Sequence, residues 1–297
     1  MNTPTSPSIV DLPLRTWDDP EARALSGEAL AALEQGQVLH FPQLSFPLSA
    51  EETALLDPAL TDPKRKNISL SARGLAGTVA EGETRERLHA TLARFRDQSG
   101  ILLDALFPGY SATRHSPATS LRLHAIGTWH PSWRKDDRLL HVDAFPSRPL
   151  RGERILRVFN NINPHGVPRT WHAGGSFETT ARHYLPALNK PWHPWLAGLM
   201  NTLGITKQRR TEYDHLMLQL HDNMKRDADY QREGDWVEVN FMPGHTWVCY
   251  SDQVPHAALS GQFMLEQTWH VPLAAMSHTE LAPVRVLERL MGRPLLV

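Results

Sequence analysis

Two residues that can bind a metal ion lie two positions apart in the stretch RLLHVDAFPSR, residues 138–148. His141 and Asp143 are separated by Val142 and have apolar neighbours on both sides. On a β-strand, residues i and i+2 project from the same face of the sheet. An imidazole nitrogen and a carboxylate oxygen from this stretch could therefore bind one small cation.

A metal site of this kind needs a second histidine, and the local context favours His256. The stretch MPGHTWVCYSDQVPHAALSG, residues 242–261, predicts a Pro-Gly turn, a strand, an Asp-containing turn and then a second strand that begins at His256. A histidine at the start of a strand could point into the mouth of a barrel. His245 and His270 are the rival ligands.

The pattern has a local competitor and a structural alternative. His278 and Glu280 have the same spacing, but no histidine follows them in the sequence. A histidine in an apolar strand is often a hydrogen-bonded core residue, and Asp143 could merely orient it. The context of His256 favours the metal site, and two histidines with one carboxylate are typical of non-haem Fe(II) oxygenases.

A co-substrate of such a site would need an anchor if it were a 2-oxo acid, because its distal carboxylate requires a buried cation. Arginine suits this role, since its planar fork can bind a carboxylate through two nitrogens. Arg157 alternates with apolar residues in RGERILRVFNNIN, residues 151–163, which predicts an inward-pointing cation. An internal partner such as Glu266 is the alternative. Four further residues could contribute to the same site: Arg122, Arg154, Asn160 and Asn161.

Composition and charge exclude several classes of protein. The chain of 297 residues carries 31 Lys and Arg against 32 Asp and Glu, which gives no reason to expect a nucleic-acid partner. The single cysteine, Cys249, excludes an internal disulfide and a cysteine-based zinc site. We expect neither a signal peptide in residues 1–17 nor a transmembrane helix. The basic cluster at residues 62–67 is expected to be a solvated loop, with contact to an anionic surface as the alternative.

The elements that must position these residues change in kind along the chain. Helical spacing and capping signals predict helices over residues 19–36, 49–60 and 84–106. A short strand is expected over 37–44, between the first two of these helices. Alternating or β-rich segments predict strands over 120–129, 138–145, 154–163, 236–243, 245–252 and 263–273. The sequence thus predicts helices in front and a β-sandwich or barrel behind.

These segments predict one catalytic domain of the α+β class over residues 1–297. A mainly helical part (1–118) precedes a β core (119–273), which contains a helical insertion at about 176–230. An amphipathic helical tail (274–297) completes the chain.

Longer strings around the candidate site resemble the Kdo 3-hydroxylase family of the Fe(II)/2-oxoglutarate-dependent dioxygenases. The strings are LLHVDAFPSRPLRGERILRVFNNINP (139–164), PRTWHAGGSFE (168–178), HDNMK (221–225) and EQTWHVPL (266–273). The likeness covers most of the chain and implies a double-stranded β-helix core. It also implies that His141, Asp143 and His256 bind the metal.

The resemblance further implies an enzyme that uses Fe(II), 2-oxoglutarate and O₂ to hydroxylate the Kdo sugar of a lipopolysaccharide precursor, Kdo-lipid A, at C3 to give Ko. Under this interpretation the co-substrate is bound by Arg157, Asn160 and Arg154. The acidic sugar would be bound by Arg148, Arg151 and Arg169. Retention of Asp143 favours hydroxylation over halogenation, which requires loss of that carboxylate.

The chain departs from the wider superfamily in one respect. Many members place the 2-oxoglutarate arginine shortly after the distal histidine, but this chain has no Lys or Arg between His256 and Arg285. This favours Arg157 as the anchor. A dioxygenase of the same fold with another substrate, and a non-catalytic β-barrel that binds a sugar acid, are the alternatives.

The expected location is the cytoplasm, with peripheral contact to the anionic inner face of the membrane. Lys64, Arg65 and Lys66 could meet such a surface. The Leu-rich tail at 286–297 could also lie in the interface, although packing on the protein's own core is favoured.

Overall fold

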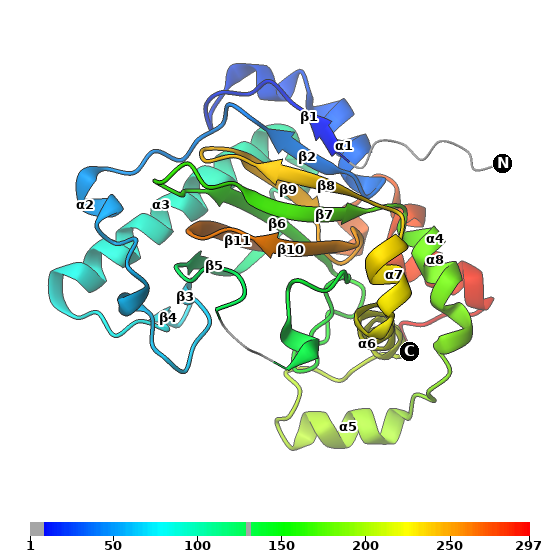
Figure 1. Cartoon of the computed structure of the whole chain (residues 1–297). Helices are drawn as coiled ribbons and strands as arrows, with labels where there is room; N and C mark the ends of the chain where they lie inside the picture. Colours follow the sequence, from blue (N-terminus) through cyan, green and yellow to red (C-terminus); the bar gives the residue numbers. More distant parts are fainter. Residues whose placement is uncertain (1–8, 129–131) are drawn as a thin grey trace.

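A computed structural model describes residues 9–128 and 132–297 (Figure 1). Its strands are β1 (Ile9–Asp11), β2 (Val38–Phe41), β3 (Ile68–Ser71), β4 (Gly74–Ala76), β5 (His115–Arg122), β6 (Arg154–Asn161), β7 (Arg169–Gly174), β8 (Trp236–Phe241), β9 (Thr246–Tyr250), β10 (His256–Ser260) and β11 (Met264–Val271). They form an eight-stranded sheet in the order β1-β2-β9-β6-β11-β5-β3-β4 and a three-stranded sheet in the order β10-β7-β8. Apart from the parallel pair β1 and β2, neighbouring strands are antiparallel.

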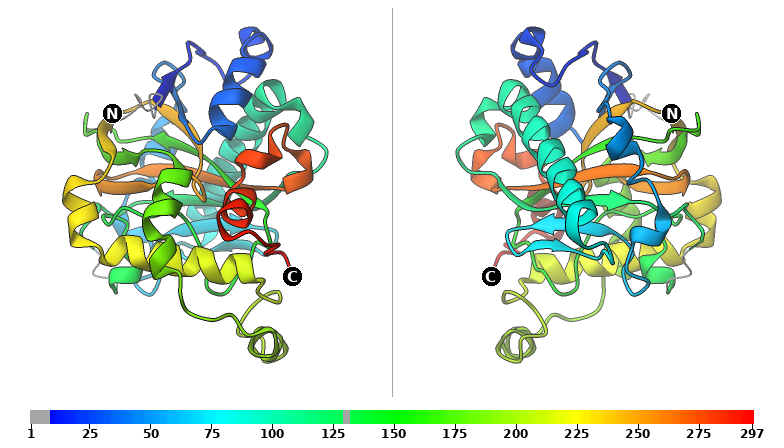
Figure 2. Two further views of the ribbon diagram at one scale, coloured as in Figure 1. Left: turned by 90° about the vertical axis from the view of Figure 1, so that its right-hand side faces the viewer. Right: turned by 90° about the vertical axis from the view of Figure 1, so that its left-hand side faces the viewer.

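The helices are α1 (Ser26–Glu34), α2 (Ala50–Thr53), α3 (Gly82–Leu106), α4 (Phe177–Tyr184), α5 (Pro194–Thr202), α6 (Glu212–Arg226), α7 (Ala228–Glu233) and α8 (Pro283–Met291). Helices α1 and α3 cover the outer face of the larger sheet (Figures 1 and 2), where their apolar side chains join the main hydrophobic core. Helices α4, α6 and α8 form a second core beside the sheets.

Aromatic side chains join the two sheets. Phe159 and Trp247 from the larger sheet meet Trp171 and Phe241 from the smaller one, and the rings of Phe241 and Trp247 stack with centroids 4.1 Å apart. Large aromatic residues bury much apolar area at such a junction. Two facing, mainly antiparallel sheets with helices outside them confirm the α+β class and the double-stranded β-helix core.

The front helices agree with the predictions in part. Residues 84–106 lie in α3, and Ser49 caps α2 through the predicted capping box with Glu52. The helix expected over 49–60 nevertheless ends at Thr53, because the residue before Pro58 is disfavoured in helical conformation. The helix expected over 19–36 is split into a 3₁₀ turn at Pro20–Arg23 and α1.

The N-terminal part contributes more to the sheets than we expected. Residues 1–118 contain more helix than strand, yet they also supply β1 to β4 of the larger sheet. The strand expected over 120–129 lies instead at His115–Arg122. Two predictions fall partly outside the described residues. The predicted strand 120–129 includes Trp129, and the signal-peptide expectation rests in part on residues 1–8.

The prediction of a strand over residues 138–145 is wrong. Only His141 pairs with a neighbouring strand, through an isolated bridge to His256. Strand β7 was not predicted, because its segment ends in two glycines and its alternation is weak. The tail packs as expected on the protein's own core, where Val286 and Leu295 are buried beside α4 and α6.

Asp214 in the helical insertion holds the segment that follows Asp143. One of its carboxylate oxygens caps α6 by accepting from Thr211, and the other accepts from the backbone N–H groups of Leu150 (2.8 Å) and Arg151 (3.0 Å). Buried donors that lose their acceptor are costly. We expect Asp214→Ala to lower the free energy of unfolding by about 2–3 kcal/mol in urea titrations. The exposed Asp229→Ala is the control, and equal effects in the two variants would contradict this role.

Candidate metal centre

The structure brings His141, Asp143 and His256 together. Their ligand atoms all lie within 4.8 Å of one another. Nε2 of His141 is 3.6 Å from Oδ1 of Asp143, and the two imidazole centroids are 4.7 Å apart. Both histidines are buried.

Backbone hydrogen bonds position these three side chains without a regular strand. The N–H of His141 donates to the carbonyl of His256 at 3.0 Å, and the N–H of His256 donates to the carbonyl of His141 at 2.8 Å. The N–H of Asp143 donates to the carbonyl of Ser251 at 2.8 Å. The predicted convergence of His141 and Asp143 therefore arises from tertiary pairing with the segment around His256.

Both imidazoles present the same nitrogen to the space between the ligands. Nδ1 of His141 lies 2.7 Å from the carbonyl of Leu139, and Nδ1 of His256 lies 2.8 Å from the carbonyl of Val254. Because a carbonyl can only accept, each Nδ1 carries the hydrogen and each Nε2 keeps its lone pair. Burial lowers the pKa of His141 to about 3 and also lowers that of His256, so both rings are neutral at pH 7. This donor set fits a divalent transition metal.

Arg157 is paired with the candidate ligand Asp143. Its Nη2 lies 2.8 Å from Oδ2 of Asp143, its Nε donates to Oγ of Ser251 at 3.0 Å, and its Nη1 pairs with Glu266. Burial alone would raise the pKa of Asp143, but the Arg157 guanidinium holds it well below its usual range. The alternative that Arg157 pairs internally with Glu266 is therefore what the structure shows. Arg157 already contacts two carboxylates, those of Asp143 and Glu266.

A cavity of about 190 Å³ opens beside the three candidate ligands, and Arg169 lines it. Arg169 is 2% exposed, and within the described part of the chain its Nε and Nη1 have no hydrogen-bond partner. Burial and the nearby Arg122 lower the pKa of Arg169 to about 9. A buried guanidinium without a partner is costly, so this position is suited to an anionic ligand.

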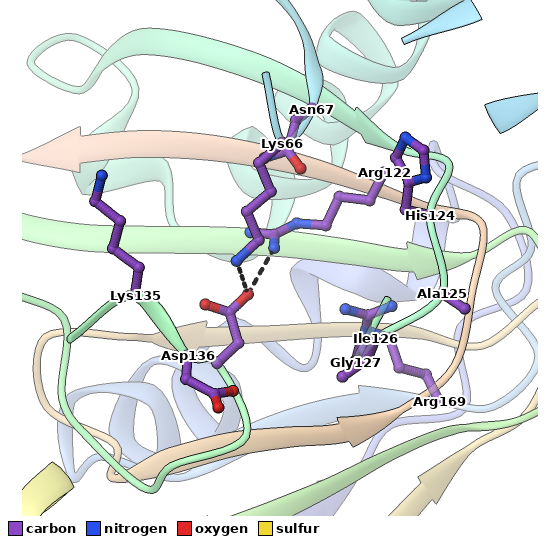
Figure 3. Close-up of a pocket in the computed structure, with 11 residues that line it drawn as sticks. Lys66, Asn67, Arg122, His124, Ala125, Ile126, Gly127, Lys135, Asp136 and Arg169 are labelled. Carbon is purple, nitrogen blue, oxygen red and sulfur yellow. Dashed lines mark hydrogen bonds and ion pairs between the residues drawn. The ribbon is translucent and has the colours of Figure 1, made fainter. Parts of the chain in front are cut away.

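A smaller outer cavity of about 50 Å³ adjoins the metal cavity and shares Arg122, Asp137 and Arg169 with it. Nζ of Lys66 and Nη1 of Arg122 both donate to the carboxylate of Asp137, at 2.5 and 3.0 Å. Figure 3 draws these two bonds as dashed lines from Lys66 and Arg122 to one unlabelled carboxylate. The expectation of a solvated basic loop at 62–67 is therefore wrong for Lys66, which is held in the wall of this cavity.

The structure places several predicted binding residues away from the metal cavity. On β6, Arg157 and Phe159 line the cavity, whereas Arg154 and Asn160 lie on the opposite face because side chains alternate. Arg154 pairs there with Asp252 at 2.7 Å, and Asn160 donates to Thr246 at 2.8 Å. We therefore correct the expectation that Arg154 and Asn160 contact the co-substrate.

The remaining candidates also lie outside the lining of this cavity. Arg148 and Arg151 are exposed, and the side-chain amide of Asn161 donates to the carbonyls of Val167 and Phe241. Among the rival histidines, His245 pairs with His40 at 2.8 Å. His278 is exposed beside Glu280, without a third ligand in the described residues.

His270 belongs to a separate group with His115 and Glu153, whose ligand atoms also lie within 4.8 Å of one another. Burial and the neighbouring His115 lower the pKa of His270 to about 4. The unfolded chain therefore binds a proton between about pH 6.5 and 4 that the folded protein does not bind at this site, so stability is lost as the pH falls through this window. We expect His270 alone to contribute a loss on the order of 1–2 kcal/mol between pH 7 and 5, measured as the difference between wild type and variant in urea unfolding. His270→Gln should flatten this dependence, and an unchanged slope would contradict the assignment.

Several residues of the metal cavity escaped the sequence prediction, among them Trp171 and Asp137. Trp171 stacks on His256, with ring centroids 5.3 Å apart, but it lies on the strand that was not predicted. Asp137 stands in the charged run RKDDR, which has the composition of a solvated loop. The sequence PRTWHAGG contains Trp171 and is one of the strings that resemble the family. That resemblance was the only feature of the sequence that could have pointed to Trp171.

Comparison with known proteins agrees with this arrangement. Residues 16–294 match the family model for 3-deoxy-D-manno-oct-2-ulosonic acid (Kdo) hydroxylase. A crystal structure of the Kdo hydroxylase KdoO, described as a non-haem Fe(II) α-ketoglutarate-dependent dioxygenase in complex with α-ketoglutarate and Fe(III), is 41% identical, with a TM-score of 0.92 over 98% of this chain and 97% of that one. Its apo structure is also 41% identical, with a TM-score of 0.93 over 98% of each chain. A search of curated proteins finds no match. From the family match and these two structures, the chain belongs to the Kdo hydroxylase family.

Proposed function

We propose that this protein hydroxylates C3 of the Kdo sugar in a Kdo-lipid A precursor to give Ko, with Fe(II), 2-oxoglutarate and O₂. The observation that carries the proposal is the family match over residues 16–294, together with two buried histidines and one carboxylate beside a cavity. Iron held by His141, Asp143 and His256 would supply the activation of O₂ that the oxidation of a C–H bond requires.

The protein's own residues would prepare this iron site. The carbonyls of Leu139 and Val254 hold each imidazole with Nε2 free, and Arg157 holds Asp143 ionised. Three protein ligands leave positions open for the co-substrate.

Arg169 is the residue that we propose for the distal carboxylate of 2-oxoglutarate. Three arginines line the metal cavity. Arg157 and Arg122 both pair with Glu266, whereas Arg169 has no ion pair in the described structure. This replaces Arg157 as the favoured anchor. The walls formed by Phe145, Trp171 and Met264 would keep water from the reacting atoms.

The acidic sugar would meet the outer cavity. Kdo carries a carboxylate two bonds from C3, so a cation must lie near the reacting carbon. Lys135 lines the outer cavity together with Arg169 and can supply that charge, whereas Lys66 is already paired with Asp137. Arg148 and Arg151, which are exposed, stay candidates for more distant parts of the substrate.

One experiment tests the function directly. Anaerobic protein is titrated with Fe(II) and 2-oxoglutarate, exposed to air with Kdo-lipid A, and the lipid is analysed by mass spectrometry. We expect succinate and a lipid that has gained one oxygen on Kdo in equal amounts. Succinate without oxidised Kdo would favour a dioxygenase with another substrate.

We further propose that residues 1–297 act as a single catalytic domain, since β1 to β4 belong to the same sheet as β6 and β11. A cytoplasmic location with peripheral contact to the membrane is part of this proposal.

A further inference from the structure

Helix α5 presents an apolar face to solvent. Trp195 and Leu203 are 69% and 64% exposed, and Leu196, Leu199 and Ile205 are also exposed. Residues 195, 199 and 203 follow one another at intervals of four, so they share one side of the helix and the turn after it. A continuous apolar face of this kind on a water-soluble surface marks an interaction site.

The position of α5 in the fold leaves this face uncovered. The helix lies at the lower edge of the molecule in Figure 1 and projects beyond the sheets in both views of Figure 2. None of its residues belongs to the hydrophobic clusters found within residues 9–128 and 132–297. Ala197, on the other side of the helix, is buried.

The charge around α5 has one sign. Residues 185–211 contain Lys190, Lys207, Arg209 and Arg210 and lack any Asp or Glu. Lys190, Lys207 and Arg209 are exposed. An apolar face with Trp and Leu, flanked by cations, is typical of a helix that lies in the interface of an anionic bilayer. Within the described residues, no helix is long and apolar enough to cross a membrane.

The same segment is tied to the metal cavity. The N–H of Lys207 donates to the carbonyl of Ser147 at 2.8 Å, and Arg210 donates to the carbonyl of Pro146 at 2.7 Å. These carbonyls directly follow Phe145, which lines the metal cavity. A bilayer that contacts α5 would therefore lie on the side of the protein that carries the segment after Asp143.

We propose that α5 with its turn (residues 194–205) is a membrane-docking element that inserts its apolar face into an anionic lipid surface. This inference rests on the proposed function insofar as the substrate is a lipid-anchored sugar. It replaces the two surfaces that the sequence offered only as alternatives, because Lys66 is engaged by Asp137 and the tail packs on the core. Docking through α5 would bring the cavity to a sugar whose lipid stays in the bilayer.

The first test measures binding to vesicles of phosphatidylcholine with about one-third phosphatidylglycerol, compared with phosphatidylcholine alone. The double variant Leu199→Gln/Leu203→Gln should bind the anionic vesicles at least roughly tenfold more weakly, because two leucines no longer enter the interface. Ile101→Gln, which changes an exposed apolar residue on α3, is the matched control and should bind as the wild type does. Lys207→Gln/Arg209→Gln should reduce the preference for anionic vesicles.

The second test compares two substrates, Kdo-lipid A in vesicles and its water-soluble deacylated sugar. The double variant should lose kcat/KM on the vesicle substrate roughly in proportion to its lost binding, and its kcat/KM on the soluble sugar should match the wild type. Equal vesicle binding by wild type and double variant would overturn the proposal. So would a wild-type dimer that the double variant converts to a monomer in light scattering, because a second copy would then cover α5. If neither sugar is oxidised while vesicle binding behaves as expected, the proposed function fails and the docking element stands.

Discussion

Replacing His256 with alanine is expected to abolish iron-dependent succinate formation. The change removes one Nε2 donor and leaves His141 and Asp143 as the only protein ligands of the predicted site. Loss of residues that merely orient metal ligands costs about 10–100-fold in affinity or activity, so loss of a ligand should exceed a hundredfold. Equilibrium dialysis with Co(II) would report the affinity, and a coupled succinate assay would report turnover.

His245→Ala is the matched control for this experiment. It also removes a partly buried histidine close to the strand β9, but its partner is His40 and it lies outside the metal cavity. We expect His245→Ala to keep its Co(II) affinity and its turnover. If His256→Ala bound Co(II) as tightly as the wild type, the assignment of His256 as a ligand would be wrong.

Replacing Arg169 with methionine should weaken 2-oxoglutarate binding and at the same time stabilise the ligand-free protein. The buried guanidinium lacks a hydrogen-bond partner for two of its nitrogens in the described structure, so its removal relieves a desolvation cost. The co-substrate would lose its charge partner, which corresponds to roughly a 30-fold or greater rise in KM for 2-oxoglutarate. Calorimetry without ligand and the KM for 2-oxoglutarate measure the two effects.

Arg157→Met provides the contrast. This arginine pairs with both Asp143 and Glu266, so its removal leaves Asp143 without its cation and Glu266 with Arg122 alone. We expect lower thermal stability and weaker Co(II) binding. If Arg157→Met raised the KM for 2-oxoglutarate while Arg169→Met did not, Arg157 would be the anchor after all.

Much of the fold could be predicted because local patterns and tertiary packing agree. The spacing of Leu88, Leu92 and Phe95 indicated α3, and the alternation in residues 154–163 indicated β6. The predictions failed where a long-range contact decides the conformation. Residues 138–145 have strand composition, yet in the structure only His141 forms a β-bridge, and its partner His256 lies more than 100 residues later in the chain.

The sequence by itself determined which kinds of residue form the predicted metal site, and to which family the chain belongs. His141, Asp143 and the context of His256 were enough to predict a metal site, because ligand chemistry belongs to residue types and short spacing. The tertiary structure alone decided which arginine is free. Arg157 forms ion pairs with Glu266 and Asp143. Arg169 faces the same cavity, and in the described residues its Nε and Nη1 have no hydrogen-bond partner. Ion pairing depends on which charges the sheets bring face to face, and that information lies in strand register and side-chain alternation across distant segments.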